Sequence, residues 1–339
     1  MKMKTDTPTV ARAIIDTPNQ PGKKKIQFRR LWQTLGPATI FLAVFVMISA
    51  YNPNFLTGGG MGIVATLSAP ILMVALGQAI VLNVGSIDLS NASMALLGAI
   101  LLGLALPIYG VSSPLIILLA TTGFGVVNGF FVAYTKVPSF ALTLGTLGIF
   151  QSGALVFSNA TAVYVSGNKD FLGHLHTTKL AGAPTTFFIG VAMAVILWFL
   201  LRYTKVGRGM TAIGLNETGA VYSGLRNRRL KVVAFAISGF MSGLGAIVII
   251  AQSGSASPNG LGSDLLLPGI AAAIVGGTSI LGGSTNPINV IFGALTVSMI
   301  PIANAVLGVN AQAQSLVYGL AIIGIAALMM NGSRSGIVK

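Results

Sequence analysis

Long runs of apolar residues without a charged side chain dominate the chain. The charge-free stretches cover residues 31–87, 89–135, 137–168, 180–201, 232–263 and 265–333. A helix needs about 20 mostly apolar residues to cross a hydrocarbon core of about 30 Å, so several stretches are long enough for two spans. Clusters of Gly, Pro, Asn and Ser would supply the turns between them. The pattern predicts an all-α polytopic membrane protein with about ten transmembrane helices, near residues 33–50, 62–83, 88–108, 114–134, 138–158, 184–202, 232–251, 265–281, 287–307 and 314–331.

The composition agrees with this class and excludes others. Of the 339 residues, 54% are hydrophobic and 8% are charged, whereas a soluble globular domain has about a quarter charged residues. The chain has no Cys, which excludes disulfides, thiolate metal sites and cysteine nucleophiles. The net charge of +14 does not point to a nucleic-acid partner, because the basic residues lie between long apolar runs. The positions of the basic residues instead indicate how the chain is oriented in the membrane.

The distribution of Lys and Arg predicts the topology. With ten spans and a cytoplasmic N-terminus, the inside segments hold 18 of the 20 basic residues, and only Lys169 and Lys179 fall outside. Cytoplasmic loops carry the Lys/Arg excess, so both termini are expected in the cytoplasm. Residues 1–30 are expected to be a disordered basic cytoplasmic tail facing anionic membrane lipid. Residues 31–333 form the transmembrane domain, with a large cytoplasmic loop at 203–231, and residues 334–339 form a second cytoplasmic tail.

Sequence signals for catalysis or cofactor binding are missing. No G-x-x-x-x-G-K-[ST] string occurs, so the chain is expected to lack a phosphate-binding loop of its own. His174 and His176 form an H-x-H pair in an outer loop without a nearby Cys or Glu, and no metal site is expected there. No catalytic residues are proposed, and the chain is not expected to be an enzyme.

An acidic residue stands out at the junction between two spans. Asp88 lies in the polar stretch from Asn83 to Ser93 and is the lone acid between residues 17 and 169. An ionisable group in or near the membrane is costly and therefore points to function. The alternative is a helix N-cap, since a carboxylate before an apolar run accepts bonds from free backbone N–H groups. Both remain open, as does the position of Asp88 at mid-membrane or at the cytoplasmic edge.

A second polar pattern opens the fifth span. Ser139, Thr143 and Thr146 lie at near-helical spacing, and their hydroxyls would either line a polar path or bond to neighbouring helices, with packing slightly favoured. From polarity and span position, the candidates for a substrate path are Asn83, Asp88, Ser90, Asn91, Thr143 and Thr146.

Two further patterns concern a cytoplasmic loop and a glycine-rich turn. The loop 203–231 contains a predicted short helix near Asn216–Ser223, closed by Gly224, which offers a docking surface for a soluble partner or a contact with lipid headgroups. The segment 276–287 is dense in Gly, and a plain turn is favoured over a broken helix that lines a cavity. Its marked residues are Gly276, Gly277, Thr278, Ser279, Gly282 and Gly283.

Together these patterns resemble the permease subunit of a ribose/xylose/galactoside-type ABC importer. In that family the first pattern usually reads S/T-G-I-D-L-S-V-G-S, and residues 87–90 match its I-D-L-S. The Gly-rich pattern G-G-T-S-x-x-G-G matches at residues 276–283. The loop pattern G-R-x-x-x-A-x-G-x-N-x-x-A-A-x-x-S-G-I matches at Gly207, Arg208, Ala212, Gly214, Asn216, Ala220, Ser223 and Gly224. The likeness runs in order from about residue 35 to residue 328.

The resemblance implies how such a protein works. The 31–333 domain would be a permease in the bacterial inner membrane, paired with a second permease copy in a homodimer or heterodimer. A cytoplasmic ABC ATPase would carry ATP and Mg, none being bound by this chain, and a periplasmic binding protein would deliver a sugar. Residues 214–224 would be the coupling helix, and the residues implicated in ATPase coupling are Gly207, Arg208, Gly214, Asn216, Glu217, Ala220, Ser223 and Gly224.

Departures from the family pattern keep other cargoes open. Ser86 replaces the Gly before the Ile-Asp pair, Asn91-Ala92-Ser93 replaces V-G-S, and Gly219 replaces one of the paired alanines. Permeases for amino acids, nucleosides, polyols or an autoinducer are alternatives. An ion-coupled secondary transporter is the main rival, although it would leave the coupling-loop pattern unexplained.

Overall fold

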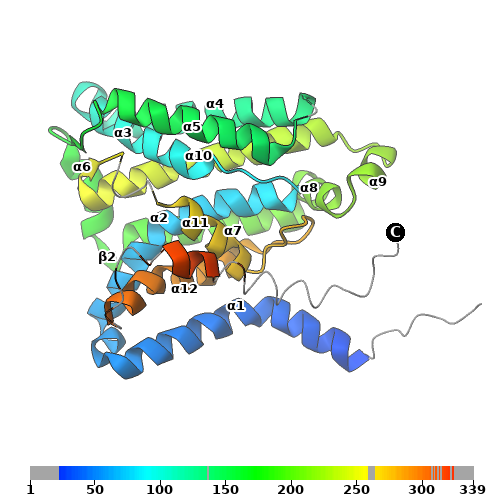
Figure 1. Ribbon diagram of the computed structural model, residues 1–339, viewed down its shortest axis with the longest axis horizontal. Helices are drawn as coiled ribbons and strands as arrows, with labels where there is room; N and C mark the ends of the chain where they lie inside the picture. The colour runs from blue at the N-terminus through cyan, green and yellow to red at the C-terminus, as the bar shows by residue number, and fades with distance from the viewer. Residues whose placement is uncertain are drawn as a thin grey trace, which may run out of the picture.

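Helices make up most of the part of the chain that the structure describes (Figure 1). The computed structural model describes residues 23–135, 137–258 and 264–306, together with residues 308, 310, 313, 315–320 and 323. Its α-helices are α1 (Lys23–Tyr51), α2 (Gly58–Asn83), α3 (Asn91–Tyr109), α4 (Ser113–Tyr134), α5 (Ser139–Phe157), α6 (Lys169–Thr177), α7 (Thr185–Tyr203), α8 (Lys205–Leu215), α9 (Glu217–Tyr222), α10 (Asn227–Ser253), α11 (Leu266–Val275) and α12 (Pro287–Val306). Short 3-10 turns η1 (Pro53–Leu56) and η2 (Gly110–Ser112) join neighbouring helices.

Four two-residue strands form two small pairs. Strand β1 (Val163–Tyr164) pairs antiparallel with β4 (Ser255–Ala256), directly after α10. Strand β2 (Lys179–Leu180) pairs with β3 (Ala183–Pro184). The β2–β3 turn consists of Ala181 and Gly182, both with positive φ, which is the backbone that a tight two-residue hairpin requires.

The long helices lie roughly side by side and run back and forth (Figure 1). Helix α10 packs against α4, α2 and α3, while α2 also contacts α11 and α12, and α1 covers α12. The start of α1 lies at the same end of the bundle as α8 and α9, and α6 and β2 lie at the opposite end (Figure 1). The basic segments around residues 23–30 and 202–231 therefore share one end of the molecule.

The prediction of an all-α, multi-pass membrane protein is confirmed. Six apolar segments of the described chain are long enough to cross a membrane: Gly58–Asn83, Asn91–Tyr134, Ser139–Phe157, Thr185–Tyr203, Asn227–Ser253 and Pro287–Val306. The second of these contains both α3 and α4, and two apolar helices, Leu35–Tyr51 and Leu266–Val275, are shorter. The tenth expected span, 314–331, lies largely outside the described residues, and the count of about ten stays a prediction.

Three expected boundaries were wrong. Residues 23–30 belong to α1 rather than to a disordered tail, because the Lys, Gln and Arg residues that dominate them are good helix formers; residues 1–22 lie outside the described part. The span expected at 265–281 contains only α11, which ends at Val275 before the glycine pair. The span expected from residue 88 begins at Asn91, because residues 84–90 form a non-helical connection.

Glycines allow α4 and α10 to approach closely. A methyl group at Gly239 of α10 would lie 3.0 Å from the Cα of Gly125 in α4, and one at Gly129 would lie 2.8 Å from the Cα of Val232. Without a hydrophobic force between helices in lipid, such close backbone packing is a main source of association. The G-x-x-x-G spacings of the two helices therefore face each other.

Candidate functional site

The first part of the site is a buried polar centre at the start of α3. The connection 84–90 enters the bundle, and Asp88 contacts Ser238 on α10. Ser238 lies eleven residues after Asn227, where α10 begins, which is about 16 Å along the axis at 1.5 Å per residue. A hydrocarbon core is about 30 Å thick. Asp88 therefore lies deep within the helix bundle rather than at its edge.

The carboxylate of Asp88 is fully buried and is bonded to Ser90, just before α3, and to Ser238 of α10. Its Oδ1 accepts hydrogen bonds from the backbone N–H of Ser90 (3.0 Å) and from the Ser90 hydroxyl (2.7 Å). Its Oδ2 accepts a bond from the Ser238 hydroxyl at 2.9 Å. The amide of Asn128 on α4 donates to Ser90 Oγ at 2.9 Å. The network joins α3, α4 and α10, and because Ser90, not Asp88, precedes the first helical residue, Asp88 is not itself the N-cap.

Other predicted path residues bond to neighbouring backbone. Asn91 donates to the Val74 carbonyl at 3.1 Å, and Ser242 of α10 donates to the Asn91 carbonyl at 2.9 Å. Thr143 accepts a bond from the Leu89 N–H at 3.0 Å. Asn91 and Thr143 are buried and fasten the 84–90 connection and the start of α3, whereas Thr146 on α5 is partly exposed.

The second part of the site is a junction at the end of the bundle that carries α8. The amide nitrogen of Asn83 donates to the Thr211 hydroxyl at 3.1 Å, and the carbonyl of Asn83 accepts a bond from the Gly283 N–H at 3.0 Å. Gly214 lies against both the Asn83 carbonyl and the Gly283 nitrogen, with no room for a side chain. The structure thus brings together members of the path, coupling and glycine-rich sets, which lie far apart in the sequence.

The segment 276–286 is a compact glycine turn between α11 and α12. Gly277, Gly282 and Gly283 have positive φ, a backbone that glycine adopts without steric cost. Within the turn, the Ser279 N–H bonds to the Ser284 carbonyl at 2.8 Å, and the Thr278 and Thr285 hydroxyls are 2.7 Å apart. A methyl group at Gly282 would lie 2.9 Å from the Gly85 Cα, so this turn also supports the 84–90 connection.

The expected short helix of the 203–231 loop is present as α9. The Asn216 side chain caps it by accepting a bond from the Gly219 N–H at 2.9 Å, and Gly224, with φ of 78°, follows its C-terminal end. Glu217 pairs with Lys231 of α10 at 2.6 Å. A second helix, α8, precedes it and was not predicted.

The remaining predicted coupling residues lie on both helices. Gly207 packs against the Leu200 carbonyl with no space for a side chain, Arg208 is exposed, and Ala220 is buried. The Ser223 hydroxyl donates to the Gly219 carbonyl at 2.9 Å. Gly276 lies against Val290 of α12.

Several polar residues were missed from the sequence because each is isolated in an apolar run. Asn128, Ser238 and Ser242 complete the buried centre, and Thr211 completes the junction. Gln78 of α2 is fully buried, and its side-chain amide has no hydrogen-bond partner within the described residues. The sequence signal that could have identified them is a single polar residue within an apolar span, because such residues are costly in lipid.

The histidine pair lies on α6, away from the two parts of the site. Partial burial, assisted by the charge of Lys179, lowers the pKa of His176. Within the described ranges, no group of three His, Cys, Asp or Glu side chains is placed to hold a metal ion.

Comparison with known proteins decides the family. The family described as "Branched-chain amino acid transport system / permease component" matches residues 60–326. The chain belongs to this permease family. The permease is 30% identical over 300 residues to the ribose import permease protein RbsC of Haemophilus influenzae, with 86% of the chain and 92% of the relative covered.

Two further relatives are permeases as well. The D-allose transport system permease protein AlsC of Escherichia coli is 32% identical over 313 residues, covering 90% of the chain and 94% of the relative. The autoinducer 2 import system permease protein LsrC of Salmonella typhi is 32% identical over 295 residues, covering 85% and 84%. These matches extend over nearly all of the helix bundle and agree with the resemblance drawn from the motifs.

Proposed function

We propose that this chain is the permease subunit of an ATP-binding-cassette importer and forms the translocation path for a monosaccharide-class sugar. Two of the relatives are named for ribose and allose, which supports a sugar as cargo. The chain would span the inner membrane about ten times with both termini inside. It would work with a cytoplasmic ATPase, a periplasmic binding protein and a second permease, and ATP and Mg would be bound by the ATPase.

The junction at Gly214 is the observation that carries this proposal. A helix pair at the basic end of the bundle, α8 and α9, is joined directly to the connection that leads to the buried polar centre. Asn83 bonds to Thr211 on one side and to Gly283 on the other, and Gly214 leaves no gap between them. A displacement of α8 by an attached ATPase would therefore be passed to the 84–90 connection and to the glycine turn.

The transport step follows from rigid-body logic. Closure of two ATPases on ATP would draw the α8–α9 pairs of two permeases together, and the packed helices would tilt as units between outward- and inward-facing states. Asp88, Ser90, Asn91 and Thr143 would hold the start of α3 in place during this motion. Asn83 would link the junction to the path, and the partly exposed Thr146 would face it.

Purification followed by reconstitution tests the proposal. The tagged permease would be extracted in mild detergent and its stoichiometric partners identified by mass spectrometry, and we expect an ABC ATPase among them. Reconstituted with that ATPase and its binding protein, the permease is expected to take up labelled ribose or allose only when ATP is supplied. A chain that purifies alone and transports without ATP would instead be a secondary transporter. ATP-driven uptake of an amino acid, nucleoside or polyol in place of sugars would change the cargo class.

A further inference from the structure

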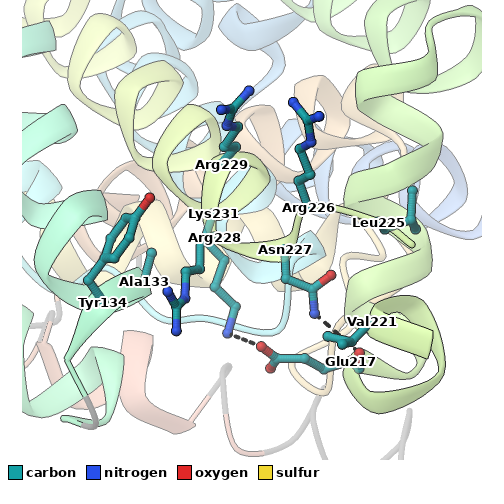
Figure 2. A pocket seen from close by; sticks show the side chains of 10 residues that line it. All are labelled: Ala133, Tyr134, Glu217, Val221, Leu225, Arg226, Asn227, Arg228, Arg229 and Lys231. Atoms are coloured by element: carbon teal, nitrogen blue, oxygen red, sulfur yellow. Dashed lines mark hydrogen bonds and ion pairs between the residues drawn. The ribbon is translucent and has the colours of Figure 1, made fainter. Parts of the chain in front are cut away.

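A basic groove lies between the end of α4, one side of α9 and the first turn of α10 (Figure 2). Its volume is about 530 Å³. Arg226, Arg228, Arg229 and Lys231 line it, against one acidic side chain, Glu217. Glu217 already pairs with Lys231, so the arginines that line the groove have no acidic partner among its other lining residues. The side chain of Arg228 points to the same side as Lys231, whereas Arg226 and Arg229 point to the opposite side (Figure 2). The groove is therefore suited to an anion.

A buried hydrogen-bond acceptor in the groove, the side chain of Asn227, indicates which kind of anion fits there. Asn227 is 8% exposed, and its amide nitrogen donates to the Glu217 carbonyl at 3.2 Å. Its Oδ1 is buried and has no hydrogen-bond partner within the described residues. An unsatisfied buried polar atom costs free energy unless a ligand or water supplies the missing bond. A ligand that carries a hydroxyl beside its negative charge would satisfy both Asn227 and Arg228.

One wall of the groove continues into an apolar helix face. The guanidinium of Arg228 lies 5.1 Å from the ring centroid of Tyr134, at the end of α4. The ring of Tyr134 stacks on Phe130 with centroids 4.7 Å apart, and Val127 and Phe131 are exposed beside it. An aromatic residue with one polar end is typical of the membrane–water interface. The charged groove and the apolar face together fit a ligand with an anionic head and hydrocarbon chains.

We propose that this groove binds an anionic phospholipid, with its phosphodiester held by Arg228, a headgroup hydroxyl on Asn227 and its acyl chains along α4. Phosphatidylglycerol has this combination of groups. Guanidinium groups bind phosphate oxygens in bidentate geometry, and basic pockets between membrane helices are known to bind anionic headgroups. An acidic segment of a partner protein would satisfy the arginines but would leave the apolar face of α4 unused. The bound lipid would fasten α9 to the ends of α4 and α10.

Lipid binding to the full-length protein in detergent tests this site directly, with no need for an ATPase. Native mass spectrometry would compare phosphatidylglycerol with phosphatidylcholine, for the wild type and for Arg228→Gln/Arg229→Gln. The matched control is Arg202→Gln/Lys205→Gln, which removes two exposed charges at the same end but outside the groove. We expect the groove variant to bind phosphatidylglycerol at least tenfold more weakly, because it loses two of the positive charges that line the groove. The control variant is expected to bind it like the wild type.

Four results would overturn the proposal. The first is equal affinity for the two lipids, and the second is an equal loss of phosphatidylglycerol binding in the control variant. The third is competition by glycerol phosphate as strong as that by phosphatidylglycerol, which would indicate a site for free anions. Loss of a co-purifying ATPase from the groove variant with lipid binding intact would also overturn it and assign the groove to the protein partner. If the double variant does not fold, the wild type still decides, because its preference for phosphatidylglycerol must weaken as salt is raised.

Discussion

The side-chain amide of Asn83 donates a hydrogen bond of 3.1 Å to the hydroxyl of Thr211. The two residues are 128 positions apart, one at the end of α2 and the other on α8. Gly214, one helical turn further on, packs against the carbonyl of the same asparagine. Two contacts from α8 thus hold the end of α2. Residues 84–90 connect this end of α2 to the buried carboxylate of Asp88. This contact links α8 to the polar centre in the interior of the bundle.

Filling the space at Gly214 is expected to interrupt that link. The side chain of Gly214→Val would overlap the Asn83 carbonyl and the Gly283 nitrogen, and such overpacking typically costs about 1–3 kcal/mol. We expect the variant to reach the membrane but to lose most ATP-driven uptake in reconstituted vesicles. Gly123→Val is the control, because nothing lies within 4 Å of that position. Normal uptake by Gly214→Val would show that the junction does not transmit motion.

The contact between α4 and α10 predicts a different kind of defect. A side chain at Gly239 would meet the Thr121 carbonyl and the backbone of Gly125, forcing the two helices apart. We expect Gly239→Val to lower the melting temperature in detergent or to prevent accumulation, since close packing drives helix association in lipid. Thermal unfolding of the purified variant measures this, with Gly123→Val on the same helix pair as the tolerated control. A Gly239→Val variant as stable as wild type would disprove the role assigned to the crossing.

Loss of the charge at Asp88 is expected to disturb the buried network. In Asp88→Asn one carboxylate oxygen becomes an amide donor, so either Ser90 or Ser238 loses its acceptor. Leaving a buried polar group unsatisfied costs about 1–3 kcal/mol, and uptake should fall with stability. Ser238→Ala removes only one donor and should have a smaller effect on the melting temperature. Uptake at the wild-type level with normal expression of Asp88→Asn would remove any role for the charge.

Charge reversal at Glu217 is expected to weaken ATPase attachment. Glu217→Lys would place a cation opposite Lys231, its present partner at 2.6 Å, and would disturb the start of α9. Because Glu217 is half-exposed and exposed ion pairs contribute at most about 1 kcal/mol, the bundle itself should stay folded. We expect less ATPase to co-purify with Glu217→Lys than with Glu217→Gln. Unchanged co-purification would count against α9 as a docking element.

The absence of cysteine makes the orientation easy to measure. Tyr222 at the end of α9 is 88% exposed, and Tyr164 in β1, beside the far end of α10, is 74% exposed. Cells that express the single variant Tyr222→Cys or Tyr164→Cys can be treated with a membrane-impermeant maleimide after the outer membrane is permeabilised and while the inner membrane is intact. We expect Tyr164→Cys to be labelled and Tyr222→Cys to be labelled only after lysis. The reverse pattern would invert the topology, and labelling of both would reject the expected arrangement.

The sequence alone was sufficient for the class, the family resemblance and most of the helices. Charge-free runs of membrane length admit few structures other than helices, because lipid offers no hydrogen-bond partners to an open backbone. Local signals also predicted three further features. The charge of the basic residues predicted the topology, capping residues predicted the short helix α9, and glycine content predicted the turn at 276–286. The helix at 23–30 and the early end of α11 were missed because element boundaries depend on small differences in local preference.

Tertiary structure decided which polar residues act together. Ser238 and Asn128 are single polar residues in apolar helices, and nothing local indicates that they meet Asp88. Asn83, Gly214 and Gly283 belong to three separate motifs, and only the folded chain brings them into contact. The glycines of α4 and α10 have spacings common in any glycine-rich membrane protein, and only the crossing of the two helices gives them a role. Sequence patterns report on neighbours along one helix, whereas contacts between helices depend on how the whole bundle is packed.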